Sequence, residues 1–114
     1  MDETSQKQDK INAAVARIWQ QKKSLTLVSI AAVERAAAAL VDGSFTSELR
    51  ANAAIEAHKL AGSLGTFGFP QGSRLSRSME EILTRASDLQ PQDGQELSEL
   101  LRKLHVELEP VSGC

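Results

Sequence analysis

His58 and His105 are the two histidines of this chain, and they are its best candidates for chemistry at neutral pH. A neutral imidazole carries a lone pair on one ring nitrogen and a proton on the other. With an unperturbed pKa of about 6.5, enough histidine is neutral near pH 7 to act as a nucleophile. His105 borders a stripe of leucines and is expected to lie at the edge of the core. His58 stands in a run of small residues, so chemistry is expected there.

Other reactive groups lack the spacing that their chemistry requires. Cys114 is the single cysteine, which excludes an internal disulfide and a Cys/His zinc cluster and fits a reducing compartment. Ser63 follows Gly62, but the order Gly-Ser-Leu-Gly is not the Gly-x-Ser-x-Gly turn of a serine nucleophile. The segment 65–68 lacks the Gly-Lys-Ser/Thr ending of a phosphate loop. We therefore expect no metal site and no cofactor on this chain.

Composition points to a globular protein without a nucleic-acid partner. The 114 residues are 41% hydrophobic and 25% charged, and 13 basic against 15 acidic side chains give a net charge of −2. Nucleic-acid-binding domains usually carry a basic excess. The sequence predicts no membrane span and no signal peptide, because the first ten residues are polar and no apolar run approaches about 20 residues. We expect one cytoplasmic domain over residues 1–114, with residues 1–8 as a flexible tail.

Helix-forming residues dominate the chain, and glycine and proline punctuate it. Apolar periodicity predicts helices over residues 9–23 and 24–41, which form either one bent helix or two, with Gly43 just past the end. A third helix is predicted from a cap at Thr46 or Ser47 to Phe67. The fourth runs over 71–87, residues 88–94 form a loop, and a final leucine-striped helix ends at Pro110. We expect an all-α, antiparallel up-down four-helix bundle with an additional N-terminal helix or helix extension.

The third predicted helix has two different faces. At about 100° per residue, one side gathers the expected core residues Leu49, Ala53, Ala57, Leu60, Leu64 and Phe67. His58 lies about 150° from the centre of that side, and the smallest side chains surround it: Ala51, Ala54, Ala61, Gly62 and Gly65. Each glycine costs about 1 kcal/mol against alanine inside a helix. Close approach of another molecule to the imidazole would explain that cost; packing of this face on another helix or protein would explain it equally.

The residues around His58 resemble the signature of histidine-containing phosphotransfer (HPt) domains. That signature has an aliphatic residue two positions after the histidine, a glycine four after, a small residue five after and a second glycine ten after. Leu60, Gly62, Ser63 and Gly68 fill these positions. The chain length and the all-helical pattern match the family as well, so the resemblance covers most of the chain.

The resemblance implies a phosphorelay protein without kinase activity of its own. His58 would accept a phosphoryl group from the aspartyl phosphate of a receiver domain and pass it to another receiver. The expected partners are response-regulator receiver domains, a hybrid histidine kinase, or both, and Mg²⁺ is expected on the partner receiver domain. Several family members have Gln or Glu 22 residues after the histidine to orient the imidazole, and Glu80 occupies that position.

The chain departs from the family at Ala61, where a lysine is usual three residues after the histidine. Lys59 and Arg77 are the predicted phosphate contacts in its place. The surface predicted for partner docking comprises Ala54, Ile55, Ala61, Gly62 and Gly65. Two alternatives stay open: a helical adaptor that is never phosphorylated and binds receiver or kinase domains through the same surface, and a domain phosphorylated from ATP by a separate kinase.

Overall fold

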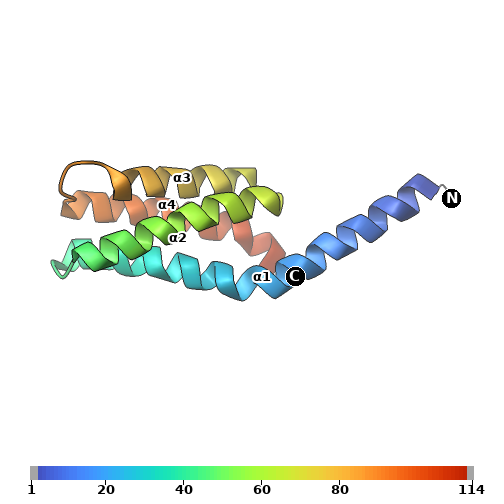
Figure 1. Cartoon of the computed structure of the whole chain (residues 1–114), viewed down its shortest axis with the longest axis horizontal. Helices are drawn as coiled ribbons and strands as arrows, with labels where there is room; N and C mark the ends of the chain where they lie inside the picture. Colours follow the sequence, from blue (N-terminus) through green and yellow to red (C-terminus); the bar gives the residue numbers. More distant parts are fainter. Residues whose placement is uncertain (1–2, 113–114) are drawn as a thin grey trace.

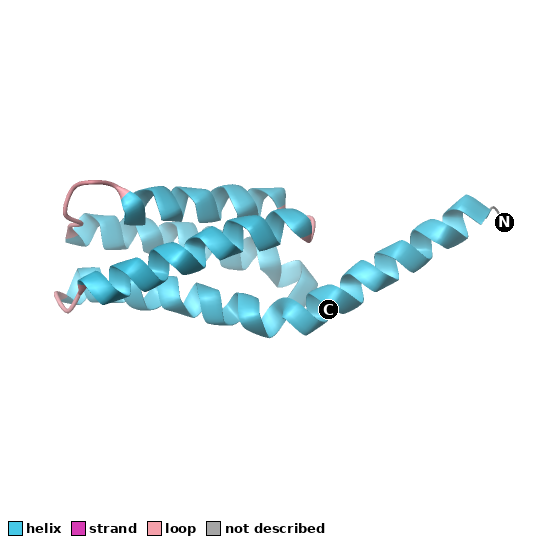
Figure 2. Cartoon of the chain, in the orientation of Figure 1, coloured by secondary structure: helices cyan, strands magenta, loops and turns pink. Residues whose placement is uncertain are grey.

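The computed structural model describes residues 3–112 and consists of four α-helices joined by short connections (Figure 1; Figure 2). No strand occurs within these residues, so the predicted all-α bundle is confirmed. The helices, in chain order, are α1 (Glu3–Asp42), α2 (Ser47–Thr66), α3 (Pro70–Thr84) and α4 (Pro91–Ser112).

The two N-terminal segments form one helix, α1, which is 40 residues long. Its C-terminal half packs in the bundle, and its N-terminal half projects past the end of the other helices (Figure 1). This projecting part stretches the molecule to 60 Å in its longest dimension, against 25 and 19 Å in the other two. Residues 3–8, predicted as a flexible tail, lie in α1; their mobility stays a prediction, and residues 1 and 2 fall outside the described part of the chain.

Local signals set the boundary between α1 and α2 as predicted. Gly43 has a φ of 84°, a left-handed conformation that glycine adopts without a steric penalty, and its N–H donates to the Ala39 carbonyl at 2.9 Å. Thr46 caps α2, because its hydroxyl accepts a hydrogen bond from the Leu49 N–H at 3.1 Å. This cap satisfies one of the backbone donors that a helix start leaves free.

Three predicted helix ends were wrong. Helix α3 ends at Thr84, not at residue 87. Pro91, predicted in a loop, begins α4, because proline fits the first helical turn, where its missing N–H has no intrahelical partner. Asp93 completes this start by accepting the Gln90 N–H at 2.7 Å. Pro110 does not end α4, because the helix continues two residues further to Ser112.

Each helix packs against two others: α1 and α3 both contact α2 and α4, and α1 does not contact α3. Two contacts along a helix pair give its direction. Glu34 meets His105, whereas the later residue Leu40 meets the earlier residue Gly94, so α1 and α4 run in opposite directions. The core is built from buried aliphatic side chains of all four helices. The α2/α3 face and the α1/α4 face therefore lie on opposite sides of the bundle.

Residues 13–42 of α1 are long and apolar enough to cross a membrane by length and composition alone. The core helix of a soluble bundle meets the same criteria, and 50% of the most apolar window is buried inside this one. Trp19 is the first buried residue of this stretch, and its ring packs on Phe67 and Phe69 with centroid distances of 5.7 and 5.1 Å.

Candidate functional site

His58 lies in the middle of α2 with its side chain 77% exposed. The opposite side of the helix faces the core, where Ala53, Ala57, Leu60 and Leu64 are buried. The amphipathic pattern of the segment thus fixes the helix on the bundle and leaves the imidazole pointing to solvent. A histidine placed this way is accessible to a second macromolecule.

Glu80 reaches His58 from the neighbouring helix α3. Its Oε2 lies 2.9 Å from the imidazole Nδ1. A carboxylate can only accept a hydrogen bond, so the pairing places a proton on Nδ1. In a neutral imidazole, Nε2 then holds the lone pair and points away from Glu80. The geometry therefore brings together the histidine and the carboxylate that the sequence predicted, and it selects the nitrogen that is free to react.

Small residues beside His58 form a low surface. Gly62 is exposed, and a Cβ built there would meet no atom within 4 Å. Gly65 is exposed as well, and its Cβ would lie 3.4 Å from the Ser73 hydroxyl of α3. Ala54 is half-buried, and Ile55 stands out as an exposed apolar side chain. Four of the five residues predicted for docking thus border the surface around the histidine.

Ala61 differs from the other predicted docking residues because it is only 5% exposed. Helix α3 covers it: the Ser73 hydroxyl donates a hydrogen bond to the Ala61 carbonyl at 2.7 Å. The prediction that Ala61 offers surface to a partner is therefore wrong. The small side chain there serves the close approach of α2 and α3.

The two predicted phosphate contacts lie on different sides of His58. Lys59 points toward α1, with its Nζ 3.4 Å from the Glu56 carboxylate, and Glu56 also accepts from the Ser29 hydroxyl of α1. Arg77 is an exposed residue of α3, on the same side of that helix as Ser73 and Glu80. Arg77 makes no ion pair within residues 3–112.

Sequence reasoning missed the contribution of α1 to this region. Leu25 is 61% exposed, although it is large and apolar. It lines a small hollow of about 140 Å³ between α1 and α2, together with Lys59 and Ser63. Leu25 falls outside the apolar stripe that predicted the helix, and that mismatch is the signal that could have marked it as a surface residue.

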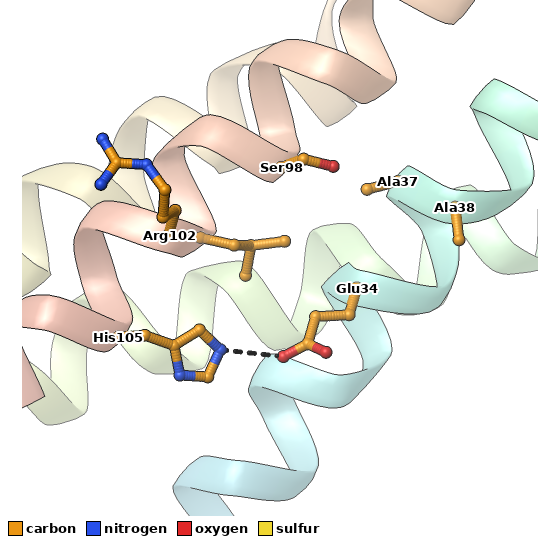
Figure 3. Close-up of a pocket in the computed structure, with 7 residues that line it drawn as sticks. Glu34, Ala37, Ala38, Ser98, Arg102 and His105 are labelled. Atoms are coloured by element: carbon orange, nitrogen blue, oxygen red, sulfur yellow. Dashed lines mark hydrogen bonds and ion pairs between the residues drawn. The ribbon is translucent and has the colours of Figure 1, made fainter. Parts of the chain in front are cut away.

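His105 also pairs with a glutamate, but on the opposite face of the bundle. Its Nε2 lies 3.1 Å from the Glu34 carboxylate, across a groove of about 430 Å³ between α1 and α4 (Figure 3). Figure 3 shows Arg102 and Ser98 on α4 and two alanines of α1 along the same groove. No group of three or more His, Cys, Asp or Glu side chains that could hold a metal ion occurs in the described part of the chain.

A family model for the Hpt domain matches residues 28–109, which cover α2, α3, residues 28–42 of α1 and residues 91–109 of α4. No curated protein and no solved structure matches the chain. The matched region contains the exposed His58, the glutamate that holds its Nδ1 and the glycines beside it. The chain therefore belongs to the Hpt domain family.

Proposed function

We propose that this protein is a phosphorelay intermediate that carries a phosphoryl group on Nε2 of His58. Membership of the Hpt family places the chain in two-component histidine phosphotransfer. The observation that supports His58 most directly is its pairing with Glu80: one ring nitrogen is held at 2.9 Å and the other is free on a side chain that is 77% exposed.

The transfer step follows from that arrangement. The Nε2 lone pair of His58 attacks the phosphorus of an aspartyl phosphate on a receiver domain. The N–P bond forms as the P–O bond to the aspartate breaks, and the electron pair stays on the aspartate carboxylate. Reacting groups must be close to in line, so the surface around the imidazole must admit another protein. The reverse step, onto a second receiver, completes the relay.

Glu80 orients and stabilises the ring during this step. As the N–P bond forms, positive charge develops on the imidazole, and the Glu80 carboxylate that accepts the Nδ1–H stabilises that charge. A hydrogen bond to a charged group contributes about 1.5–3 kcal/mol. Glu80 supplies its carboxylate from α3, so the α2/α3 packing sets its distance from the ring.

Receiver domains dock, in this proposal, on the low surface formed by Gly62, Gly65 and Ala54, with Ile55 giving apolar contact. The exposed Leu25 adds an apolar side chain of α1 beside Lys59. A response regulator or the receiver of a hybrid histidine kinase is the partner class. Mg²⁺ belongs to the partner receiver, and the chain itself has no kinase activity and works in the cytoplasm.

The experiment incubates the protein with receiver domains charged by acetyl phosphate and measures intact mass. We expect an added phosphoryl group that acid removes, that survives alkali and that is absent from His58→Gln. His105→Gln is the matched control, since His105 is also exposed and paired with a glutamate; it should be phosphorylated like the wild type.

Glu80→Ala should slow transfer roughly 10- to 100-fold, the equivalent of one charged hydrogen bond. Glu80→Gln should slow it less, because the amide oxygen still accepts from Nδ1. Receivers that bind the wild type without transferring phosphate would overturn the relay and favour the adaptor alternative. Phosphate on His105 in place of His58 would overturn the choice of residue.

A further inference from the structure

HPt domains usually have a lysine three residues after the histidine, and this chain lacks it. Ala61 stands there, and it is 5% exposed beneath α3. The Ser73 hydroxyl of α3 donates to the Ala61 carbonyl at 2.7 Å. Position 61 therefore supplies no cation on α2.

Two contacts fix how α2 and α3 lie along each other. Ser73 meets Gly65, with 3.4 Å between the serine hydroxyl and a Cβ built on the glycine. Seven residues later on α3 and seven earlier on α2, Glu80 meets His58 at 2.9 Å. The two pairs give the same antiparallel register. That register places Arg77 level with Ala61.

Arg77 also lies on the correct side of α3. It comes four residues after Ser73 and three before Glu80, and residues at these spacings share one face of a helix. Ser73 is buried and Arg77 is exposed, so Arg77 occupies the solvent edge of the α2/α3 interface. Arg77 lies one helical turn from Glu80, whose carboxylate holds the His58 ring at 2.9 Å, so the long arginine side chain can reach toward the imidazole from this edge.

Arg77 and Lys59, the two candidate phosphate contacts, differ in their ion pairs. Lys59 pairs with Glu56 on the α1 side of α2, at 3.4 Å. Arg77 makes no ion pair with any residue of 3–112. A phosphoryl group on Nε2, across the ring from Glu80, would bring a second negative charge to this site, and a nearby cation lowers the repulsion between the two. The free cation on that side is Arg77.

We propose that Arg77 binds the phosphoryl group of phosphorylated His58 and so replaces, from α3, the cation that α2 lacks at Ala61. A guanidinium presents a planar fork of donors that can hold two phosphoryl oxygens at once. It can do so both in the transfer step and in the phosphorylated product. This inference rests on the proposed function, because it requires that His58 be phosphorylated.

The test compares Arg77→Gln, Arg77→Lys, Lys59→Gln and the matched control Arg74→Gln with the wild type, using a phosphorylated receiver that charges the wild-type protein. Arg74 is an exposed arginine of the same helix, hydrogen-bonded to Gln71 at 2.9 Å. We expect Arg77→Gln to slow phosphoryl transfer at least tenfold and Arg74→Gln to stay within about twofold of the wild type, on the scale of one charge-assisted hydrogen bond. Arg77→Lys should recover part of the rate. The thermal midpoints of all variants should agree, because the three side chains are exposed.

The phosphorus NMR shift of the phosphohistidine gives a readout that a purely structural role would not move. It should change in Arg77→Gln and not in Arg74→Gln. Equal rates and equal shifts for Arg77→Gln and the wild type would overturn the proposal, as would a loss of transfer in Lys59→Gln alone. A wild-type protein that no receiver phosphorylates would instead overturn the proposed function, and the two failures are thus distinguishable.

Discussion

We expect Gly62 to lower the folding stability while it keeps the surface beside His58 accessible to a partner. Replacing it with alanine should raise the free energy of unfolding and slow phosphoryl transfer. Gly62 lies inside α2, four residues after His58, and a Cβ there meets no atom within 4 Å. The methyl group therefore causes no clash in the folded protein. Alanine is favoured over glycine in a helix interior by about 0.8–1.0 kcal/mol. We expect Gly62→Ala to raise the free energy of unfolding by that amount.

A gain of about 1 kcal/mol corresponds to a rise of roughly 4 °C in the thermal midpoint for a domain of this size. Thermal and urea unfolding followed by circular dichroism at 222 nm measure it. The same methyl group would stand on the surface where a receiver must approach His58. Overpacking by one methyl typically costs about 1–3 kcal/mol, so the rate of phosphoryl transfer from a receiver should fall about 5-fold or more.

The opposite face supplies the control for this experiment. Ser98→Ala changes an exposed side chain on α4 by one atom, beside His105 and away from His58; it should leave transfer unchanged. A Gly62→Ala protein that is less stable than the wild type would refute the argument from open space around the Cβ. A protein that is more stable and transfers at the full rate would refute the argument that the glycine keeps the surface open for a partner.

Three further substitutions test the packing that holds the site. Gly94→Ala should destabilise the fold by about 1–2 kcal/mol, because overpacking outweighs the helix-propensity gain: its Cβ would lie 2.8 Å from the Ala37 carbonyl oxygen of α1. A higher urea midpoint than the wild type would contradict this. Thr46→Ala should lose about 1 kcal/mol with the cap of α2, measured in the same unfolding experiment, where no loss would mean that the cap adds nothing. Trp19→Ala should cost about 3–5 kcal/mol, since the ring is 4% exposed and packs on two phenylalanines; an unchanged midpoint would show that the end of the bundle holds without it.

The parts of the site that sequence could predict are those set by local periodicity. The core side of α2 and the outward direction of His58 follow from helix geometry and the pattern of apolar residues. Gly43 marks the end of α1 by its backbone conformation, and Thr46 marks the start of α2 by its side-chain cap. Both effects act within a few residues, so the sequence predicts them. The match of Glu80 to His58 came from a spacing known in a family, and the contact at 2.9 Å agrees with it.

What sequence could not predict depends on contacts between helices. A helical wheel places Ala61 in the patch of small residues around His58, but α3 covers it. The sequence of α2 alone cannot show which of its faces another helix covers. The start of α4 at Pro91 depends on Asp93, which also pairs with Arg85 at 3.1 Å. Leu25 is a surface residue because α1 turns its other sides to the bundle.

The continuity of α1 has a geometric consequence for anything attached to its projecting half. A single helix runs from Glu3 into the bundle beside α2 and α4, without a break near Trp19. Each residue of such a helix advances about 1.5 Å and turns about 100°. A probe at Lys10 is therefore set at a defined angle around the helix axis relative to His58. Inserting one residue between Lys10 and Trp19 would rotate that probe by about 100° around the axis and move it only about 1.5 Å along it. Four inserted residues would bring it back close to its original direction, about 6 Å further out.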